Sequence, residues 1–347
     1  MFSAVLGLFS QDLAVDLGST HTRVFPRGTG VAAVEPSVIA VRTDRQGRRA
    51  VVASGEEALP MLGRAPHDTL ALQPIRGGRI VDYEAAEAFL LSLVRRIHGR
   101  NSWIRPRMVV AVPHGASEME LRAVRDSCES AGAREVHLVP RPVAAAIGAD
   151  LPIHEASGYL VVDVGGGSTE VSVLSLSGVV ASHSVPGGGG GMDEAIVRWV
   201  EQHHGLLIGA QTAERVKVQL GSALPPAPAD AVVKGRCLTV GVPRAVKLGA
   251  DEVHRAILPS VVAIGSAIRS VLEGVAPEIG SDIVDHGVVL TGAGARLAGL
   301  DLALRDLTGL PVVVAENPAL AVVVGARRLL EQLDQRGETG ARVARSA

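Results

Sequence analysis

The amino-acid sequence predicts an α/β protein built from two related halves, on three observations. A pattern of Asp, Gly and Thr occurs in LAVDLGSTHTRV (residues 13–24) and again in LVVDVGGGSTEV (residues 160–171), with a constant offset of 147 residues. Strand-like and helical patterns are interspersed along the chain, which is typical of α/β layers. Hydrophobic residues make up 47% of the 347 residues but aromatic residues only 2%, so the core must consist of Val, Leu, Ile and Ala.

The composition argues against several classes of function. A net charge of −2 gives no basic face for a general nucleic-acid binder, so we expect no nucleic-acid partner. Cys128 and Cys237 match no metal or redox spacing, which is typical of core thiols in a reducing cytoplasm. No apolar run approaches the roughly 20 residues of a membrane span, and the first residues lack the charge and cleavage site of a secretory signal.

In the first half, the repeat predicts a strand, a tight Gly turn and a return strand. A polar hairpin follows at residues 43–49, inside an insertion of about residues 33–75. Helical patterns cover residues 83–98 and 118–131. The segment HLVPRPVAAAIG (residues 137–148) then predicts a corner between an apolar strand end and an Ala-rich helix start.

In the second half, the second copy of the repeat predicts the same strand, turn and strand. Pro186 and the glycines at 187–191 predict a hinge-like turn before a helix at residues 192–203. Further helices are expected at residues 212–221, 258–275 and 319–333, and a Pro-rich loop at 224–230. An insertion of roughly residues 183–254 corresponds to the one in the first half, and residues 335–347 form a polar tail.

The twin Gly turns carry the candidate chemistry. Glycines let backbone N–H groups converge on an anion without obstruction by Cβ atoms, which suits phosphate groups. A single Asp-x-Gly is more often only a hairpin turn, but two copies at matching offsets favour a ligand site. Asp16 and Asp163 would hold a hydrated Mg²⁺ ion between the halves. Hydroxyl donors are added by Ser19, Thr20, Thr22, Ser168 and Thr169.

Two other segments can complete a nucleotide site. Thr212 can cap a helix on which Glu214 and Lys217 share one face, where they would bind ribose hydroxyls and an adenine edge. An exposed ion pair is the alternative. Thr291 ends a strand, and residues 292–294 lead into a helix. The N–H groups at the start of that helix face the crevice, and backbone and purine can approach each other there. A generic turn is the alternative here, and no Walker A motif occurs.

Seven further motifs, spread over the chain, carry a resemblance to a known family. They are VEPSV (34–38), GEEA (55–58), MLGRAP (61–66), AGAREV (131–136), MDEAI (192–196), IGAQTAERVK (208–217) and PE-x₃-DI (277–283). With the twin turns, they make the sequence similar from end to end to the MreB family. These are bacterial actin homologues within the actin, Hsp70 and sugar-kinase superfamily.

The resemblance implies an actin-like two-domain fold, with duplicated ribonuclease H-like halves divided into four subdomains. These are IA (residues 1–32, 76–147 and 319–340), IB (33–75), IIA (148–182 and 255–318) and IIB (183–254). It also implies ATP with Mg²⁺ in a central cleft. The implied nucleotide-binding residues are Gly18, Ser19, Thr20, His21, Thr22, Gly165, Gly166, Gly167, Ser168, Glu214, Arg215, Val216, Lys217, Gly292, Ala293, Gly294, Ala295 and Arg296.

The implied function is a cytoskeletal protein whose filaments organise cell-wall synthesis and cell shape at the inner face of the cytoplasmic membrane. The implied partners are further copies of the chain, a second MreB-like protein and the cell-wall elongation proteins. Alternatives are a small-substrate kinase or phosphatase, a chaperone-like ATPase, and a non-polymerising ATP-binding partner of another filament protein. Such an enzyme would need a large catalytic insertion and a chaperone a C-terminal substrate domain, and we expect neither.

The corner at residues 137–148 departs from the family. Two glutamates of the family, one of which is thought to position the attacking water, are replaced here by Pro140 and Arg141. Groups in such roles contribute on the order of 10²–10⁴-fold in rate. Proline offers no acceptor, and arginine stays protonated, although it could contact the γ-phosphate as a cation. We therefore expect weak ATP hydrolysis, with Glu170, Ser168 and Thr169 left as candidates to orient water.

Other departures weaken the expected site without removing it. Gly190 replaces an acidic residue near the phosphates. Ala293 adds a methyl group and Arg296 a charge to the segment expected at the adenine. His21 lies in the first turn, where a lone histidine is more often a polar loop residue than a base.

Two segments are candidates for membrane contact. Phe2, Val5, Leu6 and Phe9 fall on one face of a helix, although a frayed tail or a lead-in to the first strand is the alternative. The loop with Trp103 and Ile104 is flanked by arginines, which suits a membrane interface. The resemblance places apolar membrane contacts in this loop, and an ordinary buried Trp is the alternative.

Overall fold

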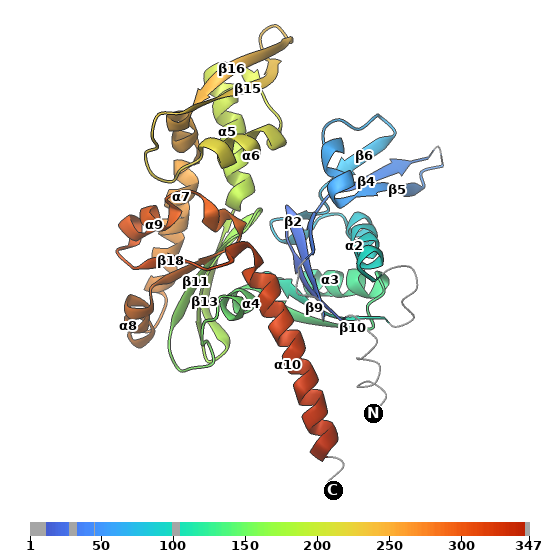
Figure 1. The fold of residues 1–347 in the computed structure, drawn as a ribbon, viewed down its shortest axis with the longest axis vertical. Coiled ribbons are helices and arrows are strands. Elements are labelled where there is room, and N and C mark those ends of the chain that lie inside the picture. Colours follow the sequence, from blue (N-terminus) through green and yellow to red (C-terminus); the bar gives the residue numbers. More distant parts are fainter. Residues whose placement is uncertain (1–11, 28–32, 45, 99–104, 344–347) are drawn as a thin grey trace. The chain divides into compact units, whose positions relative to one another are not determined.

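The structure is a computed structural model that describes residues 12–27, 33–44, 46–98 and 105–343, without the side chains of residues 98 and 334–343. The chain folds into two compact units (Figure 1). The first unit comprises Met1–Leu151 and Leu320–Ala347, and the second comprises Pro152–Ala319. The finer division into four subdomains stays a prediction.

The main sheet of the first unit has the strand order β10-β9-β1-β2-β3. Its strands are β1 (Leu13–Leu17), β2 (His21–Pro26), β3 (Ala33–Pro36), β9 (Arg107–Val112) and β10 (Glu135–Pro140). β1 and β2 form the predicted antiparallel pair around the first Gly turn, and β9 and β10 continue the sheet in parallel. All five residues of β1 are buried, as expected for a central strand covered on both faces.

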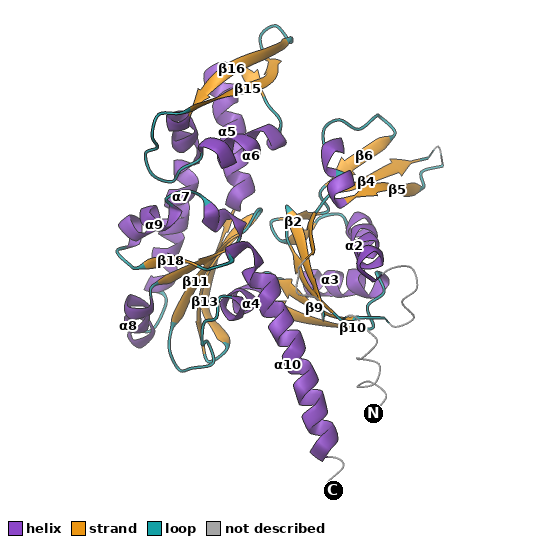
Figure 2. Cartoon of the chain, viewed as in Figure 1, coloured by secondary structure: helices purple, strands orange, loops and turns teal. Residues whose placement is uncertain are grey.

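The helices of the first unit are α2 (Tyr83–His98), α3 (Glu118–Ser130), α4 (Arg141–Gly148) and α10 (Ala321–Val343). The predicted helix at residues 83–98 is confirmed without change. α4 and α10 lie side by side (Figure 2) because glycines replace side chains where they touch. A Cβ atom on Gly148 would lie 1.8 Å from the carbonyl oxygen of Ala321, and one on Gly325 1.8 Å from that of Ala144.

A smaller antiparallel sheet in the first unit has the order β5-β4-β6. Its strands are β4 (Ile39–Thr43), β5 (Arg49–Ser54) and β6 (Thr69–Leu72), followed by the ribbon of β7 (Ile75–Arg76) and β8 (Arg79–Ile80). Two 3₁₀ turns, η1 (Gly55–Glu57) and η2 (Leu59–Met61), complete this part. The predicted polar hairpin joins β4 to β5.

The main sheet of the second unit repeats the plan of the first, with the order β13-β12-β11-β17-β18. The strands are β11 (Tyr159–Val164), β12 (Ser168–Ser175), β13 (Gly178–Pro186), β17 (Val288–Thr291) and β18 (Val312–Val314). Val164 pairs with Thr169 as Leu17 pairs with Thr22, so the two turns close in the same register. The repeat seen in the sequence is therefore a repeat of structure.

The remaining elements of the second unit are mostly helical. The helices are α5 (Gly188–His204), α6 (Ala210–Leu220), α7 (Ala250–Glu273), α8 (Pro277–His286) and α9 (Leu300–Thr308). A three-stranded sheet contains β14 (Leu206–Leu207), β15 (Asp230–Cys237) and β16 (Pro243–Gly249), and the 3₁₀ turns are η3 (Ala293–Arg296) and η4 (Pro318–Leu320).

Three predicted helix starts in the second unit were wrong. α5 begins at Gly188 instead of residue 192, and α6 begins at Ala210, so Thr212 lies in the first turn and does not cap the helix. α7 begins at Ala250 instead of residue 258 and contains Pro259. An interior proline costs roughly 3 kcal/mol in a helix, but α7 buries a long apolar face that offsets this cost.

α7 is the one described helix that is long and apolar enough to cross a membrane by length and composition. It lies instead in the core of the second unit, where it packs against β12, β13, α5 and α9. This core is built mainly from Val, Leu, Ile and Ala, as the composition requires. Both cysteines are buried and free, and burial raises the pKa of the Cys128 thiol to about 12.

Candidate functional site

The first Gly turn connects β1 to β2. The N–H of Gly18 donates to the carbonyl of Asp16 (3.1 Å), and a Cβ atom on Gly18 would lie 2.3 Å from the carbonyl oxygen of His21. Glycine is therefore required here. Ser37 closes the turn, because its hydroxyl donates to the carbonyl of Gly18 (2.6 Å) and its N–H to that of Thr20 (2.9 Å).

The polar groups of this turn divide into structural and available ones. Thr22 is fully buried, and its hydroxyl lies 2.9 Å from that of Ser37. The hydroxyl of Ser19 accepts a hydrogen bond from the N–H of Gly78 (2.9 Å), which leaves its own hydrogen to donate. In the described part of the chain, the N–H groups of Ser19 and Thr20 have no partner. These donors are suited to an anion.

Asp16, at the end of β1, is held by two arginines. Its side chain is buried, with Oδ1 3.3 Å from Nη2 of Arg141 and Oδ2 3.4 Å from Nη1 of Arg23. The same Nη2 of Arg141 donates to the carbonyl of Leu17 (3.1 Å). Arg141 is only 6% exposed, so this residue lies within the fold at the edge of the first turn.

The predicted corner places Arg141 there. β10 ends at Pro140, which caps α4, and Arg141 is the first residue of that helix. Because β10, β9 and β1 are parallel, their carboxyl ends lie at the same edge of the sheet. Sequence reasoning missed the contact with Asp16. It also missed Arg23, although the register of the predicted hairpin places Arg23 directly opposite Asp16.

The second Gly turn connects β11 to β12 and is joined to the start of α5. The carbonyls of residues 165–167 accept hydrogen bonds of 2.7–2.9 Å from the N–H groups of Gly187, Gly189 and Gly190. The expected hinge at residues 186–191 is instead the end of β13, the N-cap Gly187 and the first turn of α5. A Cβ atom on Gly190 would lie 2.9 Å from the carbonyl oxygen of Gly166. Glycine at this position, where the family has an acidic residue, therefore leaves room for the hydrogen bond between Gly190 and Gly166.

The N–H groups of Gly166 and Gly167 donate to no other described group. Their carbonyls are bonded to α5, so the amide hydrogens are the groups of this turn that are left for a ligand. The N–H groups of Ser19 and Thr20 in the first turn are left for a ligand in the same way.

Lys217 is attached to the start of α5. Its Nζ donates to the carbonyl of Gly189 (2.7 Å) and lies 2.8 Å from Oδ1 of Asp193. Burial raises the pKa of Asp193 to about 6, and the positive charge of Lys217 opposes that shift. Glu214 and Arg215 are exposed, whereas the side chain of Val216 lies in the apolar core. Lys217 is therefore held by Asp193 and Gly189, and not by an exposed ion pair with Glu214, which was the alternative for this segment.

Asp163 and residues 292–296 come together at the end of β11. Oδ1 of Asp163 accepts a hydrogen bond from the hydroxyl of Thr291 (3.1 Å). A Cβ atom on Gly292, whose φ is +81°, would lie 2.3 Å from the carbonyl oxygen of Val164, and one on Gly294 2.4 Å from its Cγ1. Both glycines are required for this packing. The expected helix after Gly292 is the short 3₁₀ turn η3, in which Ala293 and Arg296 are exposed and Ala295 is buried.

The catalytic candidates Thr169 and Glu170 are both buried in β12. The hydroxyl of Thr169 has no hydrogen-bond partner among the described residues, and Thr169 lines a cavity of about 210 Å³ that also touches α5 and α7. Glu170 pairs with Asp163 across the β11–β12 ladder, so the two carboxyl groups leave the same face of the sheet. Ser168 is half-buried at the start of β12.

The described residues contain no group of three His, Cys, Asp or Glu side chains that could hold a metal ion. A divalent cation would need water or ligand oxygens to complete its shell, as Mg²⁺ commonly does. Asp163 fits such a role because it accepts a hydrogen bond from the hydroxyl of Thr291 and lies opposite Glu170 in the strand pair. Asp16 fits less well, because both of its oxygens face guanidinium groups.

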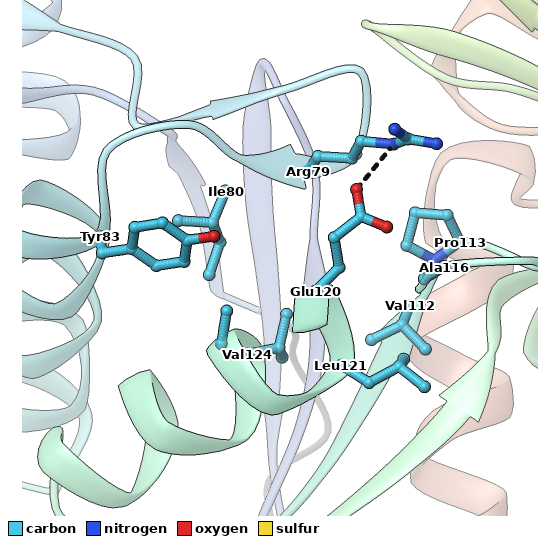
Figure 3. Close-up of a pocket in the computed structure, with 11 residues that line it drawn as sticks. Arg79, Ile80, Tyr83, Val112, Pro113, Ala116, Glu120, Leu121 and Val124 are labelled. Atoms are coloured by element: carbon cyan, nitrogen blue, oxygen red, sulfur yellow. Dashed lines mark ion pairs between the residues drawn. The ribbon is translucent and has the colours of Figure 1, made fainter. Parts of the chain in front are cut away.

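A separate hollow in the first unit lies among β8, α2, β9 and α3 (Figure 3). Figure 3 shows the ion pair of Arg79 and Glu120 at its edge, at 3.2 Å, above the apolar side chains of Ile80, Leu121 and Val124. Its volume of about 10 Å³ holds roughly one water molecule, so it is no ligand site. The membrane candidates Phe2, Val5, Leu6, Phe9, Trp103 and Ile104 lie outside the residues that the structure describes.

Comparison with known proteins gives one consistent family. A model of the MreB/Mbl protein family matches residues 10–338. The chain is 46% identical over 341 residues to the cell shape-determining protein MreB of Escherichia coli (strain K12), covering 97% of this chain and 98% of that protein. It is 36% identical over 329 residues to the cell shape-determining protein Mbl of Bacillus subtilis (strain 168), covering 94% and 98%.

Solved structures match as well. The crystal structure of MreB5 of Spiroplasma citri bound to AMPPNP is 28% identical, with a TM-score of 0.87 over 94% of this chain and 98% of that chain. The same protein bound to ADP has the same TM-score. A double helical filament of MamK, at 23% identity and a TM-score of 0.76 over 92% of this chain and 99% of that chain, is alike in fold.

Proposed function

The chain belongs to the MreB/Mbl family of cell shape-determining proteins and has the actin-like fold, and on this premise we propose that it is a filament-forming protein that binds ATP. Its filaments associate with the inner face of the cytoplasmic membrane and organise cell-wall synthesis together with the elongation proteins. Filament formation and these partners rest on the family alone.

Nucleotide binding is supported by the backbone N–H groups of the two Gly turns. In each turn two N–H groups have no partner in the described part of the chain, while the carbonyls beside them are hydrogen-bonded to the protein. Converging amide donors of this kind are typical of phosphate sites. The MreB5 structures that this chain resembles are bound to AMPPNP and to ADP.

The other expected residues take different parts in this proposal. Asp163 holds the hydrated Mg²⁺, which when bound neutralises phosphate charge. The backbone of residues 292–296 and the exposed side chains of Glu214 and Arg215 contact the adenosine. Val216 contributes only through its backbone, because its side chain is buried in the core. Lys217 acts indirectly, since it fixes the first turn of α5 against which the second Gly turn is built.

Hydrolysis is weak in this proposal. Pro140 and Arg141 supply no carboxylate at the corner, and the guanidinium of Arg141 is engaged by Asp16 and Leu17. Glu170 and Thr169 are the remaining groups that could orient water. A filament with slow hydrolysis stays in its ATP-bound form for a long time, which suits a stable scaffold or a copolymer partner.

The proposal is tested by calorimetry of ATP binding and by light scattering with lipid vesicles, with and without ATP. Gly18→Val should lower ATP affinity about 10-fold or more, because its side chain collides with the carbonyl of His21. Gly280→Ala, in α8 where an added Cβ meets no atom within 4 Å, is the matched control and should bind as the unaltered protein does. Absence of ATP binding in the unaltered protein would overturn the nucleotide part. Binding without any ATP-dependent scattering would favour a non-polymerising partner.

A further inference from the structure

We propose that Arg141 is a resident cation of the first Gly turn, which makes Asp16 a counter-ion of arginine instead of a metal ligand and leaves nucleotide binding only weakly dependent on Mg²⁺. This inference rests on the proposed nucleotide binding and concerns which groups neutralise the negative charge of the phosphates.

The carboxylate of Asp16 lies between two arginines. Both carboxylate oxygens face a guanidinium group, at 3.3 Å from Arg141 and 3.4 Å from Arg23. All three side chains are buried or nearly so, with 4% exposure for Asp16, 7% for Arg141 and 12% for Arg23. A divalent cation bound to Asp16 would lie close to two positive charges in a region of low dielectric, where like charges repel strongly.

The residue opposite the aspartate carries a negative charge in the second unit, where the first unit has a positive one. Arg23 and Glu170 are separated by the same 147 residues as Asp16 and Asp163, and each lies directly opposite its aspartate in the strand pair. The first copy therefore sets an arginine against its aspartate, and the second copy sets a glutamate against its own. A divalent cation is favoured beside Asp163 and Glu170 and disfavoured beside Asp16.

The first Gly turn has a net positive charge at its base. Arg23, Arg141 and Asp16 together carry one excess positive charge, and they lie at the base of a turn whose Ser19 and Thr20 N–H groups have no described partner. An anion at this turn would meet both the N–H donors and the excess charge. Phosphate groups can therefore bind the first turn without a metal ion to neutralise them.

The experiment compares ATP affinity in Mg²⁺ with ATP affinity in EDTA, by calorimetry on the full chain. The unaltered protein should bind less than about 3-fold more weakly in EDTA. Arg141→Met should bind about 10-fold or more weakly in EDTA than in Mg²⁺, because the excess charge is lost and an oxygen of Asp16 is released. Arg107→Met is the matched control, since it breaks the buried pair with Asp12 (2.7 Å) at the other end of β1 and should keep the ratio of the unaltered protein.

A second measurement covers the case in which Arg141→Met does not fold. Mn²⁺ binding in the presence of ATP, followed by electron paramagnetic resonance, should be unchanged in Asp16→Asn and weakened in Asp163→Asn. A ratio of 10-fold or more in the unaltered protein, or equal loss of Mn²⁺ in both variants, would overturn the inference while leaving nucleotide binding established. Failure to bind ATP in either buffer would instead overturn the proposed function, and this inference with it.

Discussion

Nζ of Lys217 lies 2.8 Å from Oδ1 of Asp193 and also donates to the carbonyl of Gly189, so one ammonium group ties α6 to the first turn of α5. α5 in turn donates to the carbonyls of the second Gly turn. The second Gly turn is therefore supported, through α5, by the buried ion pair of Lys217 and Asp193.

This pair predicts a pH dependence of stability. The pKa of Asp193 is raised from 3.8 to about 6, chiefly by burial, so its folded form binds a proton more tightly than its unfolded form. Its contribution to stability is present below about pH 4 and is lost as the pH rises through 6. The free energy of unfolding of the unaltered protein, relative to Asp193→Asn, should fall by about 2–3 kcal/mol between pH 4 and pH 7.

Urea denaturation at several pH values measures this difference. Asp251→Asn, which breaks an exposed pair with Arg255, is the control and should change the free energy of unfolding by less than about 1 kcal/mol. The assignment would be contradicted if the free energy of unfolding of the unaltered protein, relative to Asp193→Asn, stayed constant or grew as the pH rises.

The contact of α4 with α10 predicts a second effect on stability. Gly148→Ala and Gly325→Ala each place a Cβ atom 1.8 Å from a backbone oxygen, so the two helices must separate. Each should lower the free energy of unfolding by about 1–3 kcal/mol or more. Gly280→Ala, in open space on α8, should raise it by about 0.4–1 kcal/mol. Thermal unfolding that ranks Gly280→Ala with the other two would refute the close contact.

Asp163 is predicted to be needed for metal-dependent affinity. Asp163→Ala removes a buried carboxylate that accepts a hydrogen bond from Thr291, and the affinity for the metal ion in the presence of ATP should fall about 10-fold or more. Calorimetry of the folded variant measures this. Unchanged affinity would show that the metal ion, if bound, is held elsewhere.

The corner predicts the rate of hydrolysis. Restoring both glutamates, as Pro140→Glu with Arg141→Glu, should raise phosphate release by about 10-fold or more if the missing carboxylate limits the rate. Pro140→Glu alone keeps the contact of Arg141 with Asp16 and separates the two positions. If the unaltered protein already releases phosphate as fast as the restored variant, the corner is not where water is positioned.

Membrane attachment is predicted from residues outside the described part of the chain. Removing residues 1–9 together with Trp103→Ser should release the protein from vesicles in sedimentation, because the apolar contacts of both segments are lost. Many weak contacts along a filament add up by avidity, so each single change should have a smaller effect. ATP binding should persist. Full pelleting of the double variant with lipid would place the attachment in another segment.

The sequence by itself determined the features that depend on short stretches of chain. The spacing of Asp, Gly and Thr predicted both strand-turn-strand units, and the period of apolar residues predicted the helix at residues 83–98. The Pro-flanked corner and the buried cysteines were also predictable. These features follow from backbone preferences and from the side-chain period of each element, both of which are written locally.

Only the tertiary structure decided what holds these pieces in place. α5 begins early because its first N–H groups find carbonyls of a turn more than 20 residues away. Lys217 pairs with Asp193 on another helix, and Arg141 reaches Asp16 because parallel strands end at one edge of a sheet. A charge in a sequence has no fixed partner, since the partner depends on which elements become neighbours. The packing of the elements determines these partners. It makes Asp16 the partner of two arginines, whereas the sequence predicted a metal ligand at this position.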